Sequence, residues 1–243
     1  MRRYAGIVLA SLFFIFSIST FYQLMPSDKY EGKEYNYVYP INGSIANESV
    51  PQHYIMETKN ETGAVNAVTA IVVEYRGFDT LGEVTVLFTA ATGVSFLLAS
   101  LFRKKANKRK ANLIAEEGSK LVLPFALLTG AYIFIHGHLT PGGGFPGGSV
   151  IASGLLLMLL VYPKFFLSHK KLSYEESLAG SVFVIIGLLG LLFATSFLQN
   201  FISIGKPGYL FSAGIIPLIY IAIGFKVGSE LSSIVQALKE VGE

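Results

Sequence analysis

Apolar residues are concentrated in a few long stretches of the chain, and shorter polar segments separate them. A helix that crosses a bilayer needs about twenty consecutive, mainly apolar residues. A stretch with polar residues near its ends, Leu121–Leu139, is apolar enough at its centre to insert. The clearer stretches are Ala5–Met25, Leu81–Phe102, Ser149–Leu167, Ser177–Phe201 and Tyr209–Val235. The pattern predicts an all-α integral membrane protein with about six transmembrane helices.

Two apolar runs need a decision on whether they span the membrane. Met1–Thr20 resembles a cleaved signal peptide, since Arg2 and Arg3 precede an apolar run. We favour a membrane anchor, because no small-x-small cleavage site follows it. Thr62–Val73 is apolar over only about twelve residues, which is too short for a span. We therefore predict a short re-entrant or interfacial helix near residues 62–75.

The basic residues determine the predicted orientation. Six of them lie in the run 103–110, between the second and third predicted spans. Because cytoplasmic loops carry an excess of Lys and Arg, this run and the basic N-terminus are predicted to lie inside. The polar segment 26–61 then lies outside, and both termini are cytoplasmic in a multi-pass protein of the cell membrane. We do not interpret the basic run as a nucleic-acid site, because apolar spans flank it.

Composition supports the membrane class and excludes several kinds of chemistry. Of the 243 residues, 52% are hydrophobic and 14% are charged, whereas a soluble domain carries roughly a quarter charged residues. The sequence has no cysteine, which excludes disulfides, thiolate metal sites and a cysteine nucleophile. No histidine pair is spaced across two spans as haem ligation would require. We expect no cofactor and no metal.

Four ionisable residues, Glu74, Arg76, Asp79 and Glu83, lie within ten positions at the start of the second span. Charged groups at membrane depth are costly unless they are paired or hydrated, and they often mark ion paths. One interpretation is a proton or Na⁺ relay, in which Arg76 tunes the carboxylates. The other is structural: Asp79 or Thr80 caps the helix, and Glu83 completes a capping box. The residues alone leave both open.

Two other places carry candidate chemistry. His136 and His138 precede a glycine-rich turn, where histidines suit a proton relay or are simply satisfied by loop carbonyls. A metal site there lacks a third ligand. Lys226 lies four residues before Glu230 in the last span, so the two share a helix face. Lys226 either snorkels towards the inner surface, which we favour, or lies in a polar path.

These motifs carry a resemblance to a known family. The run His136–Gly148 resembles the hallmark of the B subunit of Mrp-type Na⁺/H⁺ antiporters. Asn66–Ala70 and Arg76–Glu83 resemble the C-terminal part of the large A subunit of the same complexes. The order is similar to that of neighbouring membrane subunits in membrane-bound hydrogenases and related sulfur-reducing complexes, here fused. The resemblance implies an A-like region 1–102, a basic cytoplasmic linker 103–118 and a B-like (MnhB-like) region 119–243.

The resemblance also implies a function. The chain would be a membrane subunit of a Na⁺/H⁺ antiporter module within a ferredoxin-dependent, hydrogenase-like respiratory complex, without a catalytic site of its own. Asp79 and Glu83 would take part in ion translocation, with His136 and Lys226 as weaker candidates, and Glu74 stands where the family commonly has Asp. The expected partners are other antiporter-module subunits, a hydrogenase-like peripheral arm, Na⁺, H⁺ and the lipid bilayer.

Two alternatives to this function stay open at the level of sequence. The first is a purely structural subunit of the same membrane arm, or of a free-standing Mrp antiporter. The second is a stand-alone transporter, which the absence of an internal repeat in the sequence weakens.

Overall fold

The structure is a computed structural model, and it describes residues 36–41, 44–99 and 112–242. The first predicted span, Ala5–Met25, and the basic run 103–110 lie outside the described residues. The chain divides into two compact units, one ending at Gln52 and the other beginning at His53. We describe each unit by itself.

The first unit contains a β-hairpin. Strands β1 (Asn36–Ile41) and β2 (Ser44–Ser49) pair antiparallel, with Asn36 opposite Ser49 and Ile41 opposite Ser44. The sequence Tyr-Val-Tyr in β1 is rich in residues that favour strands. No strands were predicted in this segment, because each is only six residues long and neither shows a regular hydrophobic alternation.

The second unit is helical. In chain order its elements are α2 (Val50–Thr62) from His53 onwards, α3 (Ala67–Ala70), the π-helical turn η2 (Ile71–Tyr75), α4 (Gly77–Ala99), α5 (Leu113–Ile135), α6 (Gly144–Val161), α7 (His169–Phe193) and α8 (Ile216–Gly242). Five of them, α4 to α8, are long and apolar enough to cross a membrane. The predicted all-helical membrane part is therefore confirmed for the described spans.

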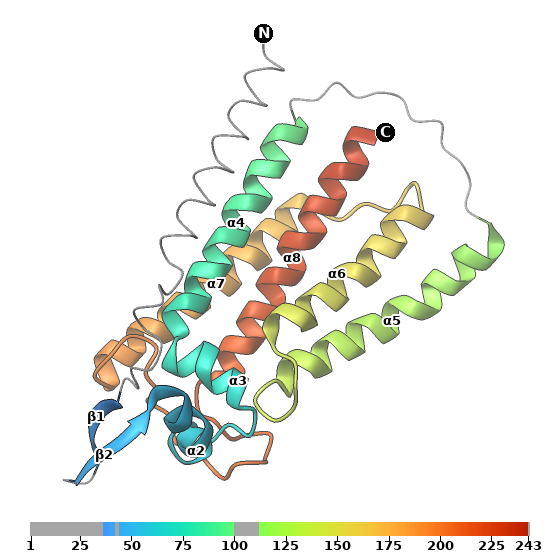
Figure 1. Cartoon of the computed structure of the whole chain (residues 1–243). Coiled ribbons are helices and arrows are strands. Elements are labelled where there is room, and N and C mark those ends of the chain that lie inside the picture. The colour runs from blue at the N-terminus through green and yellow to red at the C-terminus, as the bar shows by residue number, and fades with distance from the viewer. Residues whose placement is uncertain (1–35, 42–43, 100–111, 243) are drawn as a thin grey trace, which may run out of the picture. The chain divides into compact units, whose positions relative to one another are not determined.

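Helix α8 is the centre of the helical unit (Figure 1). It packs against α4, α6 and α7, and α6 also packs against α5. Of the apolar window of α8, 61% is buried, against 11% for α4 and 17% for α5. Most polar residues on α8 are therefore held away from lipid, whereas most of the surface of α4 and α5 is exposed in the isolated chain.

The helices begin and end at other residues than the apolar stretches predicted. α5 begins eight positions before Leu121, because the side chain of Asn112 accepts a hydrogen bond from the Ala115 amide at 2.8 Å and caps the helix. α7 spans His169–Phe193 instead of 177–201. A hydropathy window counts apolar residues whatever their backbone conformation, so it includes the apolar loop after Phe193 and omits polar helix ends.

The short helix predicted near residues 62–75 is present as α3 followed by η2. The π-helical turn shifts the hydrogen-bond register, and the Thr80 hydroxyl donates to the carbonyl of Val72. Because α4 begins at Gly77, both Asp79 and Thr80 lie inside its first turn. The capping interpretation of these two residues is therefore wrong.

Glycines bring α6 close to α8. A Cβ added at Gly148 would lie 2.7 Å from the carbonyl oxygen of Gly224, and one added at Gly144 would lie 2.5 Å from the Cβ of Ile223. These distances allow no side chain, so the two backbones approach each other as in other membrane bundles.

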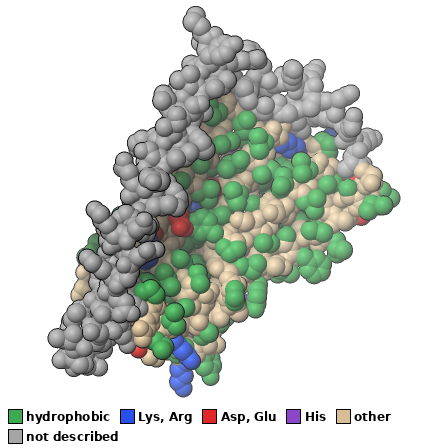
Figure 2. Space-filling view, in the orientation of Figure 1, with side chains coloured by type: hydrophobic (Ala, Val, Ile, Leu, Met, Phe, Trp, Pro, Cys, Tyr) green, Lys and Arg blue, Asp and Glu red, His purple; other side chains and the backbone are tan. Residues whose placement is uncertain are grey.

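Apolar side chains cover much of the outside of the helical unit, as the visible face in Figure 2 shows. Phe96, Ile114 and Leu160 are 77%, 82% and 73% exposed. Such a surface fits contact with lipid or with other membrane chains rather than with water.

Candidate functional site

The loop between α5 and α6, which carries the two candidate histidines, is held by the segment before α3. The amide Nδ2 of Asn66 donates to the carbonyls of Gly137 and Thr140, each at 3.0 Å. The backbone amides of Val65 and Asn66 both donate to the carbonyl of His138, at 3.0 and 3.1 Å. The two motifs that carried the family resemblance therefore form one clamp.

The same clamp reaches helix α8 through a chain of hydroxyl groups. The hydroxyl of Tyr220 donates to Thr69 Oγ1 at 3.1 Å, and Thr69 Oγ1 donates to the carbonyl of Gly137 at 2.6 Å. Both side chains are buried. Sequence analysis missed Asn66, Thr69 and Tyr220 as site residues, since their roles depend on contacts across 68 to 151 positions.

The two histidines of this loop differ in environment. His138 is fully buried, and its Nε2 lies 3.4 Å from the carbonyl oxygen of Tyr209. Burial lowers the pKa of His138, because removal from water disfavours the imidazolium. His136 stacks on Tyr132 with ring centroids 4.2 Å apart, and its Nδ1 lies 3.1 Å from the Tyr132 carbonyl. His138 is thus built into the loop, whereas His136 is more accessible.

Glu74 lies in the π-helical turn, before the spanning part of α4. Burial raises the pKa of Glu74 from 4.5 to about 7, and hydrogen bonds with Asn200 oppose the shift. The neighbouring Tyr75 donates its hydroxyl to Glu61 Oε2 at 2.5 Å. Glu61 Oε2 also lies 3.1 Å from His53 Nε2. At neutral pH, Glu74 is therefore able both to bind and to release a proton.

Asp79 and Glu83 lie on the exposed side of α4, and Arg76 lies directly before it. Arg76 Nη2 and Asp79 Oδ2 form an ion pair at 2.5 Å, with side chains 63% and 52% exposed. Glu83 is also exposed in the isolated chain. These charges lie where water or a neighbouring chain would contact them, so their role depends on what covers α4.

A different arrangement surrounds Lys226. Its ammonium Nζ lies 2.7 Å from Glu230 Oε1, and the two side chains are 10% and 0% exposed. Lys226 is ten residues from the start of α8, or about 15 Å along a helix of 27 residues. The side chain pairs inside the protein instead of reaching the surface, so the snorkelling interpretation is wrong.

Sequence analysis did not identify Glu176 on α7. Glu176 and Lys226 line the same cavity of about 570 Å³, to which Phe88 of α4 also contributes. The Lys226 ammonium lies 4.9 Å from the centre of the Phe88 ring. Sequence carries little information that would single out Glu176, because its neighbour Glu175 has the same side chain. Only the rotation of α7 places Glu175 at a separate, apolar cavity and Glu176 beside Lys226.

Apart from Glu83 and from His136, which directly follows α5, the predicted site residues form two groups in the described part of the chain. Glu74, Arg76 and Asp79 gather around the start of α4. Lys226 lies deeper, with Glu230 and Glu176. Glu83 is on α4, between the first group and the cavity-lining Phe88 in sequence.

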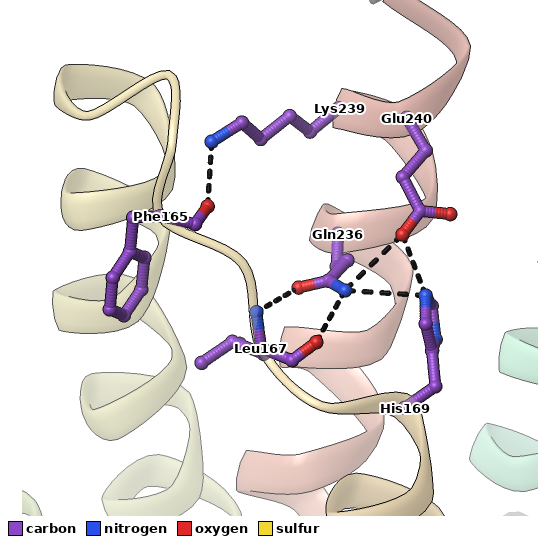
Figure 3. A network of polar contacts seen from close by, with 6 residues as sticks. All are labelled: Phe165, Leu167, His169, Gln236, Lys239 and Glu240. Carbon is purple, nitrogen blue, oxygen red and sulfur yellow. Dashed lines mark hydrogen bonds and ion pairs between the residues drawn. The ribbon is translucent and has the colours of Figure 1, made fainter.

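The C-terminal end of α8 carries a separate polar network (Figure 3). The buried Gln236 exchanges hydrogen bonds with the backbone of Leu167, at 2.5 and 2.6 Å. Glu240 lies 2.6 Å from His169, and Lys239 donates to the carbonyl of Phe165 at 2.8 Å. This network fixes the loop between α6 and α7 onto α8.

Comparisons with known families divide the chain into two matched regions. Residues 114–233 match the family described as a domain related to the MnhB subunit of Na⁺/H⁺ antiporters. Residues 36–112 match the MbhE family, described as the E subunit of MBH.

Individual relatives match either the whole chain or part of it. A chain of the membrane-bound sulfane sulfur reductase, an archaeal respiratory membrane complex, is 41% identical, has a TM-score of 0.72, and is matched over 98% of both chains. An uncharacterized protein of Methanocaldococcus jannaschii is 29% identical over 96% of this chain and 91% of its own length. The B subunit of the Na⁺/H⁺ antiporter of Bacillus subtilis is 46% identical over 57 residues, which is 23% of this chain and 40% of that protein.

The resemblance to antiporter B subunits and to sulfur-reducing complexes, predicted from the motifs, is confirmed by these matches. The relatives come from multisubunit membrane complexes, and the described part of this chain has five helices suited to spanning. The chain belongs to the family of multi-pass membrane subunits that join an MbhE-like region to a domain related to the MnhB subunit of Na⁺/H⁺ antiporters.

Proposed function

We propose that this chain is a membrane subunit of a cation/proton antiporter module and contributes part of the translocation path. The family supports a transport role, since its B-type relatives are antiporter subunits. The same homology favours a role in transport rather than in catalysis. The observation that carries the proposal is the buried ion pair of Lys226 and Glu230.

The physical argument rests on the cost of that pair. Two charges in a low-dielectric interior lose more hydration than their attraction returns, unless the geometry is very good. An apolar pair at these positions would stabilise α8 at least as well. Charges kept at this depth commonly mark a path for ions or protons. We therefore assign Lys226 to the translocation path rather than to the support of the fold.

The charged residues around the start of α4, together with His136, supply the proposed access to that path. Glu74 titrates near neutral pH, so it exchanges protons under physiological conditions. Arg76, just before α4, and Asp79 and Glu83 on α4 are exposed, and a neighbouring subunit would cover them. His136 is the more accessible histidine of the adjoining loop. These residues would lead ions from the outer surface towards the membrane interior.

The parent complex is part of the proposal. Full-length similarity to a chain of the sulfane sulfur reductase favours the membrane arm of a respiratory complex in the cell membrane. The partners would be other antiporter-module subunits and a hydrogenase-like peripheral arm, with Na⁺ and H⁺ as the transported ions. Both termini would be cytoplasmic, and the clamp around Gly137 would lie on the outer side.

The test is ion exchange by the complete complex, purified and reconstituted in lipid vesicles. The Lys226→Met variant should assemble normally and lose exchange, because the path loses its buried cation. Lys120→Met is the matched control, since Lys120 forms an ion pair of the same 2.7 Å length with Glu117 but is 55% exposed.

Normal exchange by assembled Lys226→Met would contradict the proposal and favour a purely structural subunit. If this variant fails to assemble, Glu230→Gln replaces it. That change keeps the shape of the side chain and removes its negative charge, so assembly is retained and the same loss of exchange is expected.

A further inference from the structure

The cavity between α7, α8 and α4, taken together with Glu230 as the ion-pair partner of Lys226, brings together more negative than positive charge. Among the described residues, Lys226 is the one ammonium on its lining, and Glu176 is a carboxylate on the same lining. Glu230 adds a second carboxylate, which has no exposed surface and whose Oε2 has no hydrogen-bond partner in the described part of the chain. With both carboxylates ionised, the three groups carry a net charge of about −1, which is costly in a low-dielectric site.

Lys226 lies near two carboxylates, those of Glu230 and Glu176. Its terminal atoms Cδ, Cε and Nζ would each lie 3.6 Å from a Cβ at Gly180 of α7. Gly180 is four residues after Glu176, so the two share a face of α7. The absence of a side chain at Gly180 leaves room for the end of Lys226. The ammonium of Lys226 thus pairs with Glu230 and lies beside Gly180, one helical turn from Glu176.

We infer that Glu176, Lys226 and Glu230 form an exchange site for one proton, in which the ammonium of Lys226 alternates between the two carboxylates. This inference rests on the proposed function and assigns Glu176 a part in it. A proton needs one lone pair and little space, whereas Na⁺ needs several oxygen ligands. A fully buried carboxylate beside an ammonium therefore suits a proton better.

The exchange balances in protons and charge. When Lys226 pairs with Glu230, a proton arriving from water forms an O–H bond on Glu176, and the site is neutral. When the ammonium moves towards Glu176, that O–H bond breaks and the proton passes to a carboxylate oxygen of Glu230, so the site stays neutral. When the ammonium returns to Glu230, the new O–H bond breaks and the proton leaves to water. Lys226 keeps its three N–H bonds throughout, so it moves charge without releasing a proton.

The other charged residues on the surrounding helices lie apart from Glu176, Lys226 and Glu230. Helix α6 carries no charged residue between Gly144 and Val161. On α4, Glu83 lies five residues from Phe88, or about 7 Å along the axis. On α5, the charged residues Glu116, Glu117 and Lys120 lie in its first two turns, and Lys120 pairs with Glu117. On α7, Glu175 lines the other, apolar cavity, and η2 contributes Glu74.

The adjacent glutamates of α7 provide a matched pair of variants for the test. In the purified, reconstituted complex, Glu176→Gln should reduce proton exchange about a hundredfold, the effect of losing a positioned proton-transfer group. Glu175→Gln removes the same charge one position away and should leave exchange unchanged. Infrared difference spectra between acid and neutral pH should show a carboxylic acid C=O band that Glu176→Gln removes or shifts and Glu175→Gln retains.

Each outcome separates the inference from the proposed function. Equal exchange and equal infrared bands in the two glutamine variants would overturn the inference, even if Lys226→Met still abolishes transport. Loss of neither activity nor band in any variant, Lys226→Met included, would overturn both. If Glu176→Gln does not assemble, Glu176→Asp keeps the carboxyl group and should exchange protons more slowly. A loss of Na⁺ binding with an unchanged carboxyl band would overturn the assignment to a proton.

Discussion

The side-chain amide of Asn66 donates to the carbonyl oxygen of Gly137 at 3.0 Å, although 71 residues separate them. The first residue lies before α3, in the MbhE-like region, and the second lies in the MnhB-related domain. This contact joins the two regions within one chain. It also explains why a loop so rich in glycine holds a defined conformation.

Removal of this amide should loosen the outer loop. We expect Asn66→Ala to destabilise the protein by about 1–3 kcal/mol, because the carbonyl of Thr140 loses this donor and that of Gly137 keeps only the hydroxyl of Thr69. The midpoint of thermal denaturation of the purified complex measures the effect. Asn60→Ala is the control, since Asn60 is exposed and bonds to Glu57 of its own helix. Equal midpoints for both variants would show that the clamp contributes nothing.

The contact between α6 and α8 should not tolerate a methyl group. A Cβ at Gly148 would lie 2.7 Å from the carbonyl of Gly224, so Gly148→Ala should force the helices apart and reduce the yield of assembled complex. At Gly118 on α5, no described atom lies within 4 Å of an added Cβ, and Gly118→Ala should be neutral or slightly stabilising. Size-exclusion chromatography measures assembly, and wild-type yield for Gly148→Ala would contradict this packing.

Glu74 should make stability depend on pH. Below pH 4.5 the carboxyl group is protonated in both the folded and the unfolded chain. Between 4.5 and about 7 the unfolded chain loses the proton that the folded chain keeps, so stability falls as the pH rises, and then levels off. Allowing for its partial exposure, the loss is on the order of 1–2 kcal/mol.

Denaturation midpoints between pH 5 and 8 measure this effect. Glu74→Gln, which has no titratable group, should reduce the fall in the midpoint over this range. The same slope in both proteins would mean that Glu74 is ionised in the folded chain at all these pH values.

The network at the other end of α8 should protect the loop between α6 and α7. In Gln236→Leu, Leu167 loses both hydrogen bonds to the side chain, and its backbone amide should exchange with deuterium faster. Exchange in the loop around Gly137 serves as the internal reference, and it should not change. Unchanged exchange at Leu167 would mean that the backbone of this loop is held by other contacts.

Sequence alone predicts the class of this protein well, and the site less well. Hydropathy identifies the spans because each contains many apolar residues. The ends of the helices, in contrast, depend on local caps such as Asn112. The depth of Lys226 follows from packing: an α8 covered on three sides buries its polar face. Glu175 and Glu176 are chemically identical, and only the rotation of α7 against α8 places one of them beside Lys226.

The clamp between the segment before α3 and the loop after α5 is a second feature that sequence patterns do not predict. Both motifs stand out in the sequence, yet their mutual contact depends on how α3 and the loop after α5 meet. Propensity and periodicity describe neighbours within a few positions, whereas Tyr220 and Thr69 are 151 positions apart. The chemical role of such residues becomes visible only when the tertiary contacts are known.

Exchange of the two charges on α8 tests the central claim most directly. A double variant, Lys226→Glu with Glu230→Lys, keeps an ion pair of the same spacing but turns a carboxylate towards Glu176 instead of an ammonium. We predict that the complex assembles, because the pair is still neutral, and that ion exchange in reconstituted vesicles stays as low as in Lys226→Met. Recovery of wild-type exchange together with assembly would contradict the account, since it would show that the pair serves only to neutralise charge.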